Sequence, residues 1–168
     1  VNLGQGFPDV DGPADLAEIA IAAIRDGRGN QYPPAHGLPL LRQSIAEHQQ
    51  RFYGLEVDPD TEVVVATGAS EVIAATLLAL LEPGDEVVMF DPYFDLYLAD
   101  VALAGGVRVT VPLVGPDLRP DVAALESAIT PRTRLLLINS PHNPTGIVFT
   151  PTELAGIADV AIRHDLLV

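Results

Sequence analysis

Three short segments of this sequence combine residue types that could bind an anion, a flat ring and the polar groups on that ring. The first, Ala66-Thr67-Gly68-Ala69-Ser70-Glu71, follows the apolar run 63–65. Glycine permits a tight turn, and small residues can open a helix whose free N–H groups face an anion. Taken alone, an ordinary strand-to-helix turn with Ser70 near the N-cap explains this segment more economically.

The second segment, Asp91-Pro92-Tyr93-Phe94-Asp95-Leu96-Tyr97, follows another apolar run and places aromatic rings where a planar ligand could stack. Aromatic residues at the edge of a sheet more often cover the core. The third, Asn139-Ser140-Pro141-His142-Asn143-Pro144-Thr145-Gly146, is a loop stiffened by two prolines. Its amides could donate to a ring oxygen or a carboxylate, although turn formation alone also favours Asn, Pro and Gly.

The elements around these segments alternate between strand and helix. Short apolar runs rich in Val, Ile and Leu predict strands over 63–65, 87–90, 107–111 and 135–138, with helices over 71–81, 95–104, 121–129 and from Thr150 onwards. Two further helices are predicted around 16–24 and 41–52, with a loop over 26–37 between them. The pattern favours an α/β fold with a mostly parallel, doubly wound sheet, in which ligands bind beyond the carboxyl ends of the strands.

Composition excludes several classes of function. The formal charge of −14, from 23 acidic and 9 basic residues, disfavours nucleic acid as a partner. The sequence contains no run long enough for a membrane span and no cysteine, so we expect a cytoplasmic protein without disulfides. The four histidines lack metal-ligand spacing, and no metal site is predicted. All nine basic residues are arginine, so no lysine is available to form a Schiff base.

Six segments in order resemble the class I/II aminotransferases of pyridoxal-phosphate (PLP) fold type I. The likeness is strongest to the branch with kynurenine–glutamine and N-succinyldiaminopimelate aminotransferases. The segments are Asn2 to Asp9, Gln31 to Pro33 with Gly37 to Arg42, Thr67 to Glu71, Pro83 to Val87, Pro92 to Asp95, and Asn139 to Gly146. The resemblance implies an N-terminal helical segment over 1–37, contributing to the small domain and the dimer interface. It also implies an incomplete PLP-binding large domain over 38–168.

The resemblance also implies roles for individual residues. Ala69 and Ser70 match the helix start that holds the cofactor phosphate, Phe94 matches the aromatic residue stacked on the pyridine ring, and Asn143 matches the amide that binds the ring's phenolic oxygen. Asn139 and Gly6 match positions near the substrate carboxylate.

Further expectations concern the assembly and the backbone. Tyr32 matches a tyrosine that reaches the phosphate in the neighbouring subunit, which implies a homodimer. Cis peptide bonds are expected at Ser140–Pro141 and Asn143–Pro144.

Several family residues have no counterpart here: the Asp that pairs with the pyridine nitrogen, a Tyr, the Schiff-base Lys and a substrate-binding Arg. Because an apolar strand is expected to begin at 165–168, we interpret the sequence as truncated and expect the 168 residues alone to be inactive. The expected activity of the full-length protein is transfer of an amino group from an amino acid to a 2-oxo acid. A PLP-dependent carbon–sulfur lyase and a non-catalytic module that binds a phosphate ligand or a partner remain alternatives. The donor is open among kynurenine, methionine, glutamine and succinyl-diaminopimelate.

Overall fold

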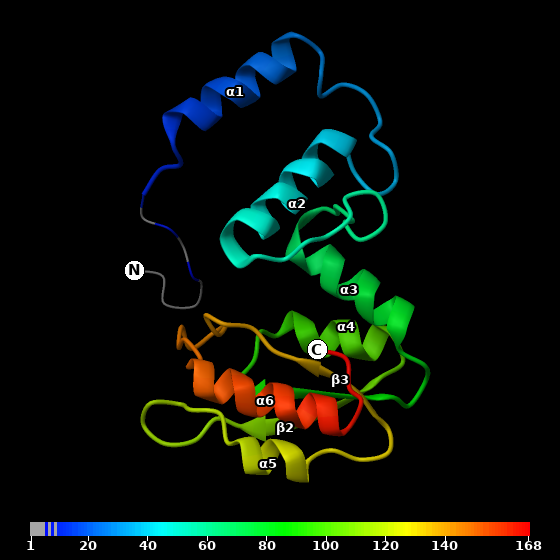
Figure 1. Cartoon of the computed structure of the whole chain (residues 1–168), viewed down its shortest axis with the longest axis vertical. Helices are drawn as coiled ribbons and strands as arrows, with labels where there is room; N and C mark the ends of the chain where they lie inside the picture. The colour runs from blue at the N-terminus through cyan, green and yellow to red at the C-terminus, as the bar shows by residue number, and fades with distance from the viewer. Residues whose placement is uncertain (1–5, 7, 9) are drawn as a thin grey trace. The chain divides into compact units, whose positions relative to one another are not determined.

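The computed structural model describes residues 6, 8 and 10–168. Its internal contacts divide the chain into two compact units, residues 1–65 and 66–168, which are described separately (Figure 1). The domain boundary expected between residues 37 and 38 refers to the domains of a longer enzyme and stays a prediction.

The first unit contains the helices α1 (Ala14–Arg25) and α2 (Pro39–Tyr53), as expected. Proline suits the first position of α2 because the N–H that it lacks would have no partner there. The helix ends at Gly54, whose φ of 67° lies in the left-handed region. The buried Arg42 donates to the Pro59 carbonyl and pairs with Asp60 at 3.2 Å, which ties α2 to the loop that follows it.

The strand predicted over 63–65 is wrong. These residues form a loop in which Val63 is buried, Val64 is 71% exposed, and the Val65 N–H donates to the His36 carbonyl at 3.1 Å. β-Branched residues favour strands only where a neighbouring strand offers a ladder of hydrogen bonds and a surface to pack on. Among the described residues of the first unit, this run has one backbone hydrogen-bond partner, the His36 carbonyl.

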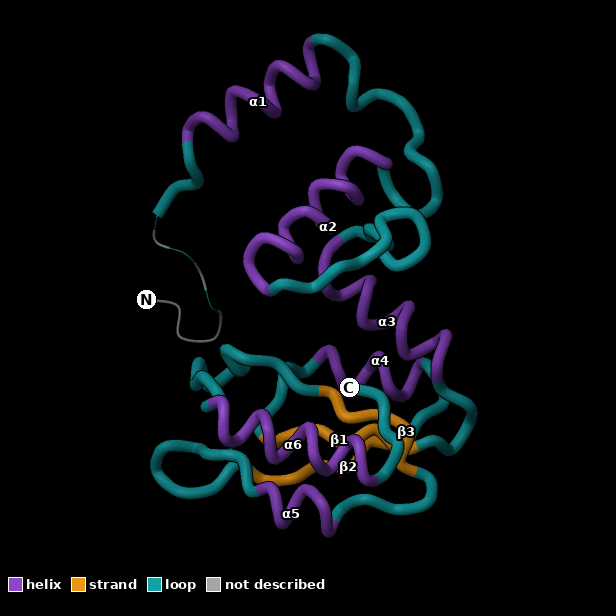
Figure 2. The backbone as a smooth tube through the Cα atoms, in the orientation of Figure 1, coloured by secondary structure: helices purple, strands orange, loops and turns teal. Residues whose placement is uncertain are grey.

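The second unit is a three-stranded parallel sheet flanked by helices. Figure 2 shows the strands in orange and the helices in purple. The strands are β1 (Glu86–Asp91), β2 (Val107–Pro112) and β3 (Thr133–Leu137), in the order β2-β1-β3. The helices are α3 (Gly68–Leu80), α4 (Leu96–Leu103), α5 (Val122–Ser127) and α6 (Pro151–Arg163). A parallel bridge between Leu135 and Leu167 extends the pairing beyond β3.

β1 is buried on both faces, because its side chains alternate between two cores. Val87 and Met89 join the core formed with α3 and α4, whereas Val88 and Phe90 join the core formed with α5 and α6. This arrangement explains why β1 is apolar almost throughout. The predicted doubly wound α/β architecture is confirmed.

The helix α6 begins as its sequence predicts. The Thr150 hydroxyl accepts from the Glu153 N–H at 3.3 Å, and the Glu153 carboxylate accepts from the Thr150 N–H at 2.7 Å. This capping box satisfies two backbone donors at the helix start. Among the described residues, no helix has both the length and the apolar character needed to cross a membrane.

Candidate cofactor site

Two of the three predicted ligand-binding segments of the second unit follow strands that end at one edge of the sheet. Because β1 and β3 are parallel and pair Met89 with Leu137, their carboxyl ends lie side by side. Phe94 follows the end of β1 by three residues, and Asn139 follows the end of β3 by two. Near the start of α3, Val72 and Ile73 line one pocket together with Leu137 and Ile138 at the end of β3, so the helix start lies towards the same edge.

The start of α3 can bind an anion. Gly68 has a φ of 85°, which allows the chain to turn sharply into the helix, and Ala69 and Ser70 are both exposed. The N-cap residue is Thr67, and its side chain makes no capping hydrogen bond. Ser70 lies near the N-cap, as expected, in the first turn of the helix. Its hydroxyl and the nearby N–H groups can serve a ligand.

A carboxylate already stabilises the turn before this helix start. The Glu71 side chain accepts a hydrogen bond from the Thr67 N–H. That backbone donor lowers the pKa of Glu71, so the side chain stays ionised at neutral pH. Glu71 thus holds the Thr67 turn, while Ala69 and Ser70 face outward.

Of the three aromatic residues after β1, only Phe94 offers an exposed ring. Phe94 is 36% exposed and meets Tyr97 edge to face, with ring centroids 5.6 Å apart. Tyr97 is buried in α4, and its burial raises the pKa of the hydroxyl. Tyr93 is covered by Arg108, which lies 5.5 Å from the ring centroid and donates to the Tyr93 hydroxyl. The residues alone did not show which of the three rings would stack on a ligand, and only the resemblance pointed to Phe94. The exposure of the Phe94 ring favours the same choice.

The loop after β3 presents two amides. Asn139 donates from Nδ2 to the Pro141 carbonyl at 3.1 Å, whereas Asn143 is exposed and makes no side-chain hydrogen bond to any described residue. The cis peptide bonds expected at Ser140–Pro141 and Asn143–Pro144 are confirmed. A third, Asp91–Pro92, was not predicted.

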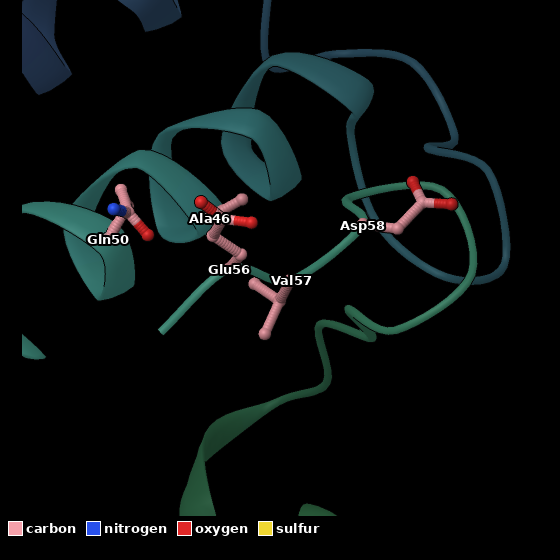
Figure 3. Close-up of a pocket in the computed structure, with 5 residues that line it drawn as sticks. All are labelled: Ala46, Gln50, Glu56, Val57 and Asp58. Atoms are coloured by element: carbon pink, nitrogen blue, oxygen red, sulfur yellow. The ribbon is translucent and has the colours of Figure 1, made fainter. Parts of the chain in front are cut away.

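Two predicted site residues, Tyr32 and Gly6, belong to the first unit. Tyr32 is fully exposed and lines a pocket of about 350 Å³ together with Gly29, Asn30, Gln31 and Pro33. Gly6 is also exposed. A larger pocket of about 480 Å³ beside α2 contains none of the predicted residues. Its lining is Ala46, Gln50, Glu56, Val57 and Asp58 (Figure 3).

Sequence reasoning gave no role to His142, which is only 5% exposed and adjoins Asn143. Its Nδ1 lies 2.8 Å from the Thr145 hydroxyl, and its burial lowers the pKa of the imidazole, so that the neutral form is favoured. The sequence carried no signal for this burial, because a polar side chain in a Pro- and Asn-rich loop normally lies in water.

A helix start with free N–H groups, an exposed ring and an exposed amide are the chemical groups that recognition of a phosphorylated aromatic ligand requires. The chain belongs to the aminotransferase class I and II family, whose model matches residues 1–168.

Individual relatives cover the chain from end to end. It is 54% identical to the probable N-succinyldiaminopimelate aminotransferase of Mycobacterium tuberculosis, covering 100% of this chain and 43% of that protein. The solved structure from that organism superposes with a TM-score of 0.93 over 98% of this chain and 43% of that chain, at 52% identity. The methionine aminotransferase of Escherichia coli is 38% identical, again over 100% of this chain and 43% of that protein. The chain thus spans less than half the length of these relatives.

Proposed function

We propose that the protein containing these 168 residues is a PLP-dependent aminotransferase that transfers an amino group from an amino acid to a 2-oxo acid. The observation that carries the proposal is the grouping of the α3 start, Phe94 and the Asn143 loop at one edge of the sheet. Each meets a different part of the cofactor: phosphate, ring face and ring oxygen. The family match supports the same reading.

The residues present fit the cofactor chemically. The N–H groups at Ala69 and Ser70, with the Ser70 hydroxyl, would hold the phosphate, since a helix start favours negative charge. Phe94 would stack on the ring, and the Asn143 amide would donate to its phenolic oxygen. When bound, PLP supplies the electron sink that labilises bonds at the amino-acid α-carbon. The protein's task at this edge is to hold and orient the ring.

Substrate binding draws on residues outside the cofactor contacts. We assign Asn139 and Gly6 to the substrate carboxylate, because an amide donor and an unhindered backbone suit a small anion. The 54% identity to a probable N-succinyldiaminopimelate aminotransferase makes N-succinyldiaminopimelate the first donor to test. Methionine, kynurenine and glutamine follow.

The lysine that carries the cofactor must lie outside the 168 residues, because they contain none. The 168-residue chain alone is accordingly inactive. The proposal includes a cytoplasmic homodimer in which Tyr32 reaches the partner's cofactor phosphate, and the division into an N-terminal segment, residues 1–37, and part of the large domain, residues 38–168. The full exposure of Tyr32 supports its part in this assembly.

The deciding experiment uses the full-length protein. We expect PLP absorbance, a lysine-linked adduct after borohydride reduction, and conversion of the donor only when a 2-oxo acid is supplied. Donor breakdown without the acceptor would instead indicate the carbon–sulfur lyase, and absence of bound PLP would contradict the proposal and favour a non-catalytic module. The separately produced 168-residue chain is the lysine-free control, and turnover by that chain would refute its inactivity.

A further inference from the structure

His142 and Asn143 are neighbours in the sequence but occupy opposite environments. Asn143 is exposed, whereas His142 is 5% exposed and its ring stacks on Phe149, with centroids 5.8 Å apart and planes inclined by 26°. Burial of an imidazole costs solvation, which the 2.8 Å contact between its Nδ1 and the Thr145 hydroxyl offsets. This polar pair, His142 and Thr145, flanks Asn143 in the sequence.

Backbone hydrogen bonds close the loop around this pair. The His142 N–H donates to the Ile147 carbonyl at 2.8 Å, and the Gly146 N–H donates to the His142 carbonyl at 2.6 Å. Both bonds involve the His142 backbone, so residues 142–147, which include Asn143, form a closed loop. The His142 backbone therefore holds both ends of the segment that bears Asn143.

The His142 ring is in turn connected to β1. Phe149 meets Phe90 edge to face, with centroids 5.7 Å apart and planes at 83°. Phe90 is a buried residue near the end of β1, four residues before Phe94. A continuous chain of aromatic contacts thus runs from the loop that carries Asn143 to the strand that leads to Phe94.

We propose that His142 is a positioning residue that, through Thr145 and Phe149, fixes the Asn143 amide relative to the Phe94 ring. This inference rests on the proposed function, because Asn143 and Phe94 matter together only if both contact one planar cofactor. The Nδ1 contact with Thr145 distinguishes this role from filling space: a phenylalanine could replace the stack but not that hydrogen bond.

The test uses the full-length protein and the variants H142F, T145V and N143A, with each pairwise combination. H142F preserves an aromatic ring and removes the Thr145 contact, and T145V removes the same contact from the other side. H164F is the matched control, because His164 is exposed at the end of α6. The readouts are the PLP dissociation constant, from an absorbance titration, and hydrogen exchange of the Gly146 amide in the cofactor-free protein.

We expect H142F and T145V each to raise the PLP dissociation constant about 3- to 10-fold, the loss typical of one hydrogen bond, and together to raise it no more than either alone. In the N143A background, H142F should change the constant less than about 2-fold, because its effect passes through that amide. Exchange at Gly146 should accelerate in H142F and remain unchanged in H164F.

Effects of H142F and N143A that add fully would overturn the proposal, since His142 would then act on the fold in general. The proposal would also be overturned if H142F and H164F had the same PLP dissociation constant. A parent protein that binds no PLP would instead overturn the proposed function, and this inference with it.

Discussion

Arg119 and Glu153, 34 residues apart in the sequence, form a two-point ion pair in which both arms of the guanidinium meet the carboxylate that also caps α6. The Nε to Oε1 distance is 2.8 Å. The Arg119 hydrogen bonds, with help from Thr150, lower the pKa of Glu153 to about 2. One side chain thus completes the helix cap and anchors the loop that carries Arg119.

This pair predicts a defined dependence of stability on pH. Because the folded-state pKa is depressed, the ionised Glu153 stabilises the fold above its ordinary pKa of 4.5, and this contribution disappears as the pH falls towards about 2. At about pH 7, Glu153→Gln should lower the free energy of unfolding by about 1 to 2 kcal/mol, allowing for partial exposure. Urea unfolding of the full-length protein between about pH 2 and 7 measures this. Asp159→Asn, an exposed change on the same helix, is the control, and equal losses would contradict the prediction.

A second carboxylate, Glu86, is 3% exposed at the start of β1. Hydrogen bonds from the hydroxyls of Thr130 (2.5 Å) and Thr133 (3.2 Å), and from Arg132 (2.5 Å), keep it ionised, and the Thr130 bond contributes most to lowering its pKa. Glu86→Ala leaves these donors unpaired, so we expect a loss of about 2 to 4 kcal/mol in the free energy of unfolding. The exposed Glu82→Ala should cost less than about 0.5 kcal/mol in the same assay. A loss from Glu86→Ala no larger than that of Glu82→Ala would show that the buried cluster does not stabilise the sheet.

Much of this fold was predictable because each signal is local. The capping box at Thr150 and the stop at Gly54 fix helix ends by backbone chemistry, and the apolar run in β1 identifies a strand covered on both faces. The run 63–65 carries the same β-branched signal, but pairing depends on a partner distant in the sequence, which no local pattern encodes.

For the candidate site, too, the features set by local sequence could be predicted, and those set by distant residues could not. Two of its three segments could be located because ligand-binding residues follow strand ends. The preference for Phe94 over Tyr93 could not be derived from the residues alone, because it depends on Arg108 reaching the Tyr93 ring from β2. His142 was overlooked because its partner Phe149 becomes a neighbour only when the loop closes.

The helix start of α3 predicts a loss of cofactor affinity without a loss of fold. Ser70→Ala should raise the PLP dissociation constant of the full-length protein about 5- to 20-fold, since a hydroxyl donor to a dianionic phosphate is removed from an exposed position. Ser127→Ala removes an equally exposed hydroxyl, which bonds the Ala123 carbonyl in α5, and should leave the constant unchanged. Equal PLP dissociation constants for Ser70→Ala and Ser127→Ala would show that the phosphate does not bind at the start of α3.

Tyr32 gives a test of the proposed homodimer with a shared active site. Tyr32→Phe should raise the PLP dissociation constant about 3- to 10-fold, by removing a phenolic donor to the partner's phosphate. Tyr53→Phe, at the exposed end of α2, is the matched control. Dilution below the dimer dissociation constant, followed by analytical ultracentrifugation, should abolish the difference between Tyr32→Phe and the parent. A difference that persists in the monomer would contradict a contact across subunits.

The alternating burial of β1 also limits which genetic changes the chain can survive. Val87 and Met89 serve one core and Val88 and Phe90 the other, so deletion of one residue within the strand would exchange the two sets and send each towards the wrong helices. Codon insertions and deletions should therefore be purged from β1, while the exposed turn at Gly115–Asp117 can vary in length. A library of single-codon insertions and deletions in the full-length gene, selected for a folded product, would measure this contrast. Variants altered within β1 should be lost, and variants altered at 115–117 should survive.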